Sequence, residues 1–231
     1  MGDWYGKFLF SPLRTAVVAS ALLTHAWLPT KAAENGFGSF AEFEKSSLPQ
    51  DILWKVLARS GKSKTYTQVL PLDGGTVGIA NFARGGLAGL YEVMDTQEYF
   101  GRSKDDMVRN YSSKCRPGNH SGNDTGWGCY SQKWWRDGMI RFVHSPDSHD
   151  LQKRAWINEM KPTVELSIQH GWRSDRDLAI ATGIANSVGG DGFSKTAARH
   201  GWRPEEVLSA YVGNNDHRKR RRDAINTAFP Q

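Results

Sequence analysis

Residues 66–95 read YTQVLPLDGGTVGIANFARGGLAGLYEVMD and combine a glycine turn, a short β-type run and a helical pattern. Asp73 stands before two glycines, which turn the chain tightly because glycine adopts positive φ angles without steric cost. The β-type run, 76–80, is interrupted at Gly78, where another group can approach the backbone closely. Apolar residues then recur at three- and four-residue spacing, which predicts a helix with one buried face. These residues are Leu87, Leu90, Tyr91 and Met94.

This pattern predicts that Asp73 lies at the mouth of a strand and turn, with a helix behind it. The alternative is an ordinary turn in which the Asp73 side chain bonds its own backbone. The stretch by itself leaves both interpretations open.

The composition indicates a folded protein with a sizeable core. The chain has 231 residues, enough for one large domain or two small ones, and 39% of them are hydrophobic. It contains nine Trp, seven Tyr and ten Phe, which excludes a disordered chain. We expect most of these aromatic rings to fill the core, although aromatic rings also stack on sugars.

Residues 1–33 have the layout of a secretory signal peptide. Lys7 and Arg14 precede an apolar run, 15–28, and small residues at 30–33 offer a cleavage site. The apolar run is too short for a comfortable membrane span, so a retained anchor is the weaker alternative. We therefore expect a secreted or periplasmic protein without stable membrane insertion.

The chain has two cysteines, Cys115 and Cys129, both in a segment rich in Gly, Asn and Ser. In an oxidising compartment they would form a disulfide that closes a loop of about 15 residues and contributes about 3 kcal/mol. Two free thiols are the alternative if residues 1–33 are not an export signal.

The formal net charge is +6, and the basic residues are unevenly placed. Residues 1–33 hold three basic residues and one acidic residue, so residues 34–231 carry +4. Residues 216–223 (DHRKRRRD) hold five basic and two acidic residues, which leaves the remainder nearly neutral. A basic run this short is more often a solvated helix end than a nucleic-acid site. We expect an anionic polymer of the cell envelope rather than DNA as partner.

The remaining pattern is mainly helical. Ser39 and Glu42 have capping-box spacing before a helix that ends near Lys45, and a second helix runs from Pro49 to about Ser60. We expect an irregular segment from 95 to 132, then helices to the C-terminus, one of them from Pro204 to Val212. No internal repeat is apparent. The fold class is therefore α+β.

Three motifs carry a resemblance to a known family. Residues 66–82 hold an aspartate-glycine turn followed by Thr-x-Gly, residues 142–156 contain a Phe and a Gln that open a helical region, and Glu165 stands five residues before His170-Gly171. On these motifs the chain resembles the lysozyme-like superfamily, and within it the family 46 chitosanases. The resemblance implies a mainly helical, two-lobed fold with a small β wing. Residues 34–231 would form one catalytic domain, with a small lobe at 50–130 and a helical lobe at 134–231.

The resemblance also implies a glycoside hydrolase that cleaves β-1,4 linkages in an amino-sugar polymer with two carboxylates. By position, Asp73 would be the carboxylate that activates water or stabilises the oxocarbenium-like transition state. Glu165 would be a buried acid in a structural ion pair, with Arg176 or Arg154 as its partner. We expect three residues to bind substrate, which are Tyr66, Thr76 and Asn81.

One departure from the family pattern concerns the general acid. The family places a glutamate at the end of the helix before the β wing, whereas residues 57–62 read LARSGK. Serine cannot donate the proton because its pKa is far too high. Either Glu92 or Glu44 serves instead, or catalysis is weakened. Burial of Glu92 behind the β wing would raise its pKa as an acid requires.

The substrate remains open between peptidoglycan and chitosan. The basic charge favours anionic peptidoglycan and the motifs favour polycationic chitosan, and we place peptidoglycan slightly ahead. A glycan-binding protein that has lost the acid is the alternative function. A weaker alternative is a metal site in residues 144–150, formed by His144, Asp147, His149 and Asp150. Our prediction is a monomer without metal or cofactor.

Overall fold

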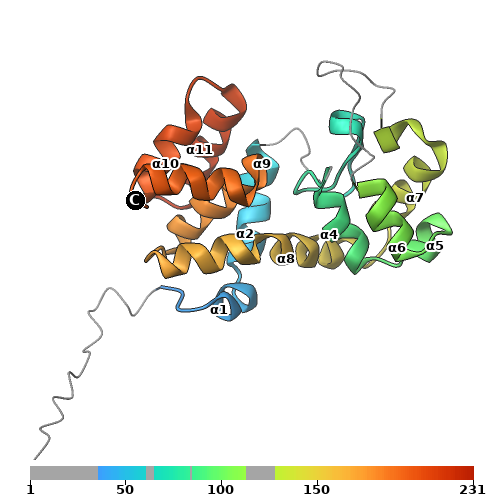
Figure 1. Ribbon diagram of the computed structural model, residues 1–231, viewed down its shortest axis with the longest axis horizontal. Coiled ribbons are helices and arrows are strands. Elements are labelled where there is room, and N and C mark those ends of the chain that lie inside the picture. Colours follow the sequence, from blue (N-terminus) through green and yellow to red (C-terminus); the bar gives the residue numbers. More distant parts are fainter. Residues whose placement is uncertain (1–35, 61–64, 84, 113–127) are drawn as a thin grey trace, which may run out of the picture. The chain divides into compact units, whose positions relative to one another are not determined.

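The computed structural model describes residues 36–60, 65–83, 85–112 and 128–231 (Figure 1). All of these belong to one compact unit, Asn35–Gln231. The predicted signal peptide, 1–33, lies outside the described residues. Within them, no helix combines the length and the apolar character that a membrane crossing requires.

The described part is mainly helical with one small antiparallel sheet, which confirms the expected α+β class. The elements of the first half are α1 (Phe40–Lys45), α2 (Leu48–Asp51), η2 (Ile52–Leu57), α3 (Ala58–Ser60), β1 (Val69–Leu70), η3 (Leu72–Gly74), β2 (Thr76–Val77) and α4 (Gly86–Val93). The elements that follow are α5 (Thr96–Phe100), α6 (Lys104–Asp106), η4 (Met107–Ser112), η5 (Gly128–Ser131), α7 (Lys133–Val143), α8 (Ser148–Gln169), α9 (Asp175–Arg199), α10 (Pro204–Val212) and α11 (Asp216–Ala228).

The predicted start of α1 is confirmed with one change in its capping contacts. Ser39 accepts a hydrogen bond from the backbone N–H of Glu42 over 3.3 Å. The Glu42 carboxylate accepts a hydrogen bond from the backbone N–H of Gly38 over 2.7 Å. In a capping box it would accept from the N-cap residue itself, Ser39. Both contacts still satisfy backbone donors at the helix start.

The predicted β-type run, 76–80, forms a strand only at its first two residues, β2, and the sheet contains a strand that was not predicted, β1. β1 pairs with β2 in the register Val69↔Val77 and Leu70↔Thr76. The β-type pattern stops at Gly78, which has a φ of 67° and begins a turn that ends at Asn81, φ 55°. Positive φ angles at both residues are incompatible with a continuous strand.

The prediction of an irregular segment at 95–132 is wrong for its described residues, which contain α5, α6, η4 and η5. These helices are too short to show apolar periodicity. Their caps hold them instead: Asp95 accepts from Glu98 N at 3.0 Å, and Ser103 accepts from Asp106 N at 3.2 Å.

The C-terminal helices include the predicted α10 with the same bounds. α9 is interrupted at Gly189, φ 79°, within a glycine-rich stretch, 189–192. α8 packs against α4, α7, α9 and α1, and so joins the region around the sheet to the C-terminal helices (Figure 1). The largest core side chains are the fully buried Trp135, Trp156 and Trp172, whereas Trp54 is 44% exposed.

A short repeat escaped the sequence analysis. His-Gly-Trp-Arg occurs at 170–173 and at 200–203, directly after α8 and after α9. The glycine of each copy has a positive φ, 85° and 59°, as expected where a helix ends. Trp172 Nε1 donates a hydrogen bond to the Trp202 carbonyl over 2.7 Å. The two turns therefore pack against each other.

Candidate functional site

Asp73 lies on a turn whose backbone is tightly constrained. Its φ of 52° and ψ of 27° fall in the left-handed region, which costs a non-glycine residue free energy. The turn is closed by Gly75 N–H, which bonds the Leu72 carbonyl at 2.9 Å, and by Thr76 Oγ1, which donates to the same carbonyl at 2.7 Å. The exposed Asp73 side chain is therefore held on a defined turn.

The turn rests on the core behind it. A side chain at Gly75 would meet Trp135, because a Cβ there would lie 2.7 Å from the indole ring. The buried indole Nε1 in turn donates to Tyr91 Oη, on α4, over 2.8 Å. Burial raises the pKa of Tyr91, so the hydroxyl stays protonated. These contacts agree with the expectation that a helix lies behind the Asp73 turn.

Gln152, on α8, fixes the other end of the hairpin. Its Oε1 accepts from Ile79 N at 3.2 Å, and its Nε2 donates to the Tyr66 carbonyl and to Ser148 Oγ, each at 2.8 Å. The side chain is fully buried and touches the backbone at Gly78, where a Cβ would lie 1.8 Å from Oε1. This close approach explains the glycine that interrupts the β-type run.

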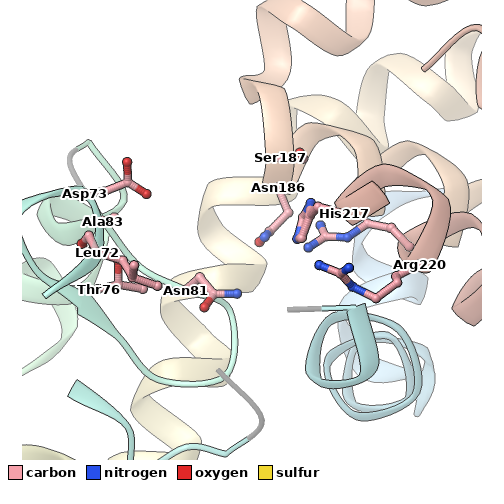
Figure 2. Close-up of a pocket in the computed structure, with 10 residues that line it drawn as sticks. Leu72, Asp73, Thr76, Asn81, Ala83, Asn186, Ser187, His217 and Arg220 are labelled. Atoms are coloured by element: carbon pink, nitrogen blue, oxygen red, sulfur yellow. The ribbon is translucent and has the colours of Figure 1, made fainter. Parts of the chain in front are cut away.

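A pocket of about 540 Å³ lies beside Asp73. Its lining residues come from the hairpin region and from α9 and α11. They are Leu72, Asp73, Thr76, Asn81, Ala83, Asn186, Ser187, His217, Arg220 and Arg221. Figure 2 shows Asp73 on one side, His217 and Arg220 on the opposite side, and Asn186 beside them.

The structure therefore brings together three residues predicted for the site, Asp73, Thr76 and Asn81. The residues contributed by α9 and α11 were not predicted from the sequence. Asn186 joins the two sides: its Nδ2 donates to the Ala80 carbonyl at 3.2 Å and its Oδ1 accepts from Trp156 Nε1 at 3.0 Å. Asn186, a polar residue three positions before the break in α9 at Gly189, was the available signal.

The basic run 216–223 does not act as a single charged surface. Arg218 lies over the Tyr211 ring, 5.0 Å from its centroid, while Lys219 pairs with Asp216 and Arg222 with Asp223. Three other residues of α11 line the pocket. They are His217, Arg220 and Arg221, spaced three and four apart on one helix face.

Arg221 is buried, with 1% of its surface exposed. Its Nε donates to Ser60 Oγ at 2.9 Å and its Nη1 to the Gly183 carbonyl at 2.7 Å. Burial lowers the pKa of Arg221 to about 10, so the guanidinium remains charged at neutral pH. In the part of the chain that the structure describes, no carboxylate forms an ion pair with Arg221.

Two predicted site residues lie outside this pocket's lining. Tyr66 is a core residue, 2% exposed, whose ring stacks on His149 with centroids 4.2 Å apart and whose hydroxyl accepts from Gln50 at 3.2 Å. Glu92 is exposed on α4, so it lacks the burial that its assignment as general acid required. Glu44, the other candidate, is also exposed.

The predicted ion pair between Glu165 and Arg176 is wrong. Glu165 is exposed and its nearest cation is Lys161, at 3.9 Å on the same helix. Arg176 instead forms two contacts with Glu205, Nε to Oε1 at 2.7 Å and Nη2 to Oε2 at 3.0 Å. Arg176 also donates to Asn226 Oδ1 and to the Phe229 carbonyl, and so ties α9 to α10 and α11.

Glu159, on α8, is an acid that the sequence analysis did not consider. The residue is exposed, yet desolvation by the surrounding protein raises the pKa of its carboxyl group. A Cβ at Gly86 would lie 3.6 Å from Glu159 Oε2, so the carboxyl group approaches the start of α4. It does not line the pocket beside Asp73.

Two further predictions concern cysteines and metals. Cys115 lies outside the described residues, so its disulfide with the buried Cys129 stays a prediction. The alternative metal site at 144–150 is not supported, because within the described ranges no group of three or more His, Cys, Asp or Glu side chains could hold a metal ion.

The site thus combines a carboxylate on a constrained turn with the arginines of α11 on the opposite side. Searches against protein-family models, curated proteins and solved structures found no match for this chain.

Proposed function

We propose that this protein is a glycoside hydrolase of lysozyme-like, two-lobed fold that cleaves β-1,4 linkages in an amino-sugar polymer. Asp73 is the carboxylate that activates water or stabilises the oxocarbenium-like transition state. The observation that carries the proposal is the position of Asp73, exposed on a left-handed turn at the edge of a 540 Å³ pocket. Backbone strain is often retained where it holds a functional side chain in place.

The lining of the pocket suits a carbohydrate. Amide and hydroxyl groups from both sides, those of Asn81, Asn186 and Ser187, can bond sugar hydroxyls. The Asn81 backbone N–H donates to the Gly78 carbonyl and the Asn186 side chain donates to the Ala80 carbonyl. These contacts hold both residues before a ligand binds, which reduces the conformational entropy lost on binding.

A specific observation favours a second candidate, a glycan-binding protein without turnover. Among the described lining residues, Asp73 supplies the only carboxylate, whereas hydrolysis by the two-carboxylate mechanism needs a second acid about 5–10 Å away. The helix end where the family carries its acid holds Ser60, which is bonded to Arg221. Three acids of the chain lie outside the described residues, namely Asp3, Glu34 and Asp124.

The test is the release of reducing ends from peptidoglycan and from chitosan by the purified protein. Asp73→Asn removes the carboxylate with little change in size, and Asp191→Asn, an exposed aspartate of α9, is the matched control. We expect the wild type and Asp191→Asn to release reducing ends, and Asp73→Asn to be reduced at least about 100-fold.

Binding of either polymer without release of reducing ends would replace the hydrolase by the glycan-binding candidate. Activity that survives in Asp73→Asn would remove the assigned role of this carboxylate.

A further inference from the structure

Arg221 poses a physical problem that the proposed hydrolysis does not explain. A buried guanidinium loses its hydration, and proteins normally offset this loss with a carboxylate. Among the described residues, Arg221 donates hydrogen bonds only to neutral acceptors, Ser60 Oγ and the Gly183 carbonyl. Yet it lies in the lining of an open polar pocket, so its buried positive charge stands directly behind the pocket surface.

The α11 residues that line the pocket are His217, Arg220 and Arg221, and together they form what we call the α11 wall. A second positive charge of this wall is that of Arg220. Arg220 is exposed and lines the same pocket, while the neighbouring Lys219 and Arg222 have carboxylate partners away from it. The described acid of the lining, Asp73, comes from the opposite side (Figure 2). The pocket is thus polarised, with a carboxylate on the hairpin side and arginines on the α11 side.

This distribution of charge favours binding of one class of amino-sugar polymer over another. A free ammonium group, as in chitosan, would be repelled at the α11 wall. A carboxylate would make charge-assisted hydrogen bonds there, and arginine forms these in a bidentate geometry.

We propose that the α11 wall is a carboxylate subsite, in which the exposed Arg220 binds an acidic substituent of the sugar polymer and the buried charge of Arg221 behind it strengthens the attraction. The substrate is then an acidic amino-sugar polymer of the peptidoglycan type rather than chitosan. The substrate class rests on the proposed function, whereas the anion subsite holds for a binding protein as well.

The test compares two soluble glycan probes of equal length. One is a peptide-free strand of alternating N-acetylated amino sugars whose lactyl ethers carry carboxylates, and the other is the same strand with those carboxylates reduced to alcohols. Binding is measured by calorimetry in the Asp73→Asn protein, so that hydrolysis cannot change the probes. A third probe, the strand with its peptide stems, shows whether the carboxylate lies on the sugar or on the peptide.

Arg220→Gln is the main variant, because Arg220 is exposed and the protein should fold without it. Arg222→Gln is the control with the same change of charge, since Arg222 lies on the same helix and pairs with Asp223 at 2.7 Å. We expect Arg220→Gln to weaken binding of a carboxylated strand about tenfold and to leave the reduced strand unchanged. Arg222→Gln should change neither by more than about twofold.

Equal affinity for the carboxylated and reduced strands would overturn the subsite, as would an equal loss in Arg220→Gln and Arg222→Gln. The outcome is separable from that of the hydrolysis assay. Loss of activity in Asp73→Asn without carboxylate discrimination would leave the hydrolase and remove the subsite. Discrimination without hydrolysis in the wild type would leave the subsite and remove the hydrolase.

Discussion

Arg221 donates a hydrogen bond from Nε to Ser60 Oγ over 2.9 Å, across 161 residues of sequence. Ser60 ends the helical segment before the sheet, and Arg221 lies on the last helix, α11. Ser60 is fully buried and its hydroxyl donates onward to the Leu57 carbonyl at 3.4 Å. The contact joins two parts of the chain beside the pocket and gives a buried charge one of its two described acceptors.

Ser60→Ala should destabilise the protein by about 1–3 kcal/mol, because it leaves the buried Nε–H of Arg221 without an acceptor. The free energy of unfolding from urea denaturation measures this. Ser47→Ala is the control, since Ser47 is exposed and makes no capping hydrogen bond. A loss no larger than that of the control would show that the Ser60 contact contributes nothing to stability.

Gln152→Ala should cost about 3 kcal/mol, because Ile79 N–H and the Tyr66 carbonyl both lose their buried partner. Gln169→Ala, at an exposed position of the same helix, should change stability by less than about 0.5 kcal/mol. Chemical denaturation of the two variants gives the comparison. Similar values for both would contradict the role of Gln152 in fixing the hairpin.

Gly78→Ala should couple to Gln152. The added Cβ would lie 1.8 Å from Gln152 Oε1, so part of its cost disappears when Gln152 is shortened. A double-mutant cycle with Gln152→Ala should give a coupling energy of at least about 1 kcal/mol. The strain of a non-glycine residue at φ 67° remains in both backgrounds. Additive effects would mean that the hairpin moves away from α8 to relieve the contact.

Glu205→Gln should lower stability by up to about 1 kcal/mol at neutral pH. The hydrogen bonds from Arg176 lower the pKa of Glu205, so its contribution is present above the usual value of 4.5 and is lost as pH falls through the folded-state pKa. Thermal unfolding across acidic and neutral pH measures the difference from the wild type. Glu206→Gln is the control, because its partner Arg203 is highly exposed. A difference that does not shrink on acidification would contradict the assignment.

Glu159→Gln should have the opposite effect on stability from Glu205→Gln. Desolvation raises the pKa of Glu159, so its ionisation disfavours the folded state above the usual value of 4.5. The variant should therefore be more stable than the wild type at neutral pH, and the gain should vanish at acidic pH, where Glu159 is protonated in both states. Calorimetric unfolding of Glu159→Gln and of Glu165→Gln, an exposed acid on the same helix, tests this. An equal gain of stability in both variants would mean that removing any negative charge from α8 stabilises the protein, whatever its burial.

Local features were predictable where neighbouring residues determine them. The Ser39 cap and the bounds of α10 follow from side chains within one helical turn of each helix start. The glycine turn at Asp73 was predictable for the same reason. The ion pair of Glu165 was not, because many arginines can pair with one acid and only the packing of α9 and α10 brings Arg176 to Glu205.

The sequence by itself therefore determined the mainly helical α+β class, the turn that carries Asp73 and the apolar faces of the helices. These depend on contacts between residues a few positions apart. Only the tertiary structure decided what faces Asp73. The α11 wall, with Arg220 and Arg221, lies more than a hundred residues further along the chain, and burial of Arg221 depends on packing between α11, α9 and the helical segment that ends at Ser60.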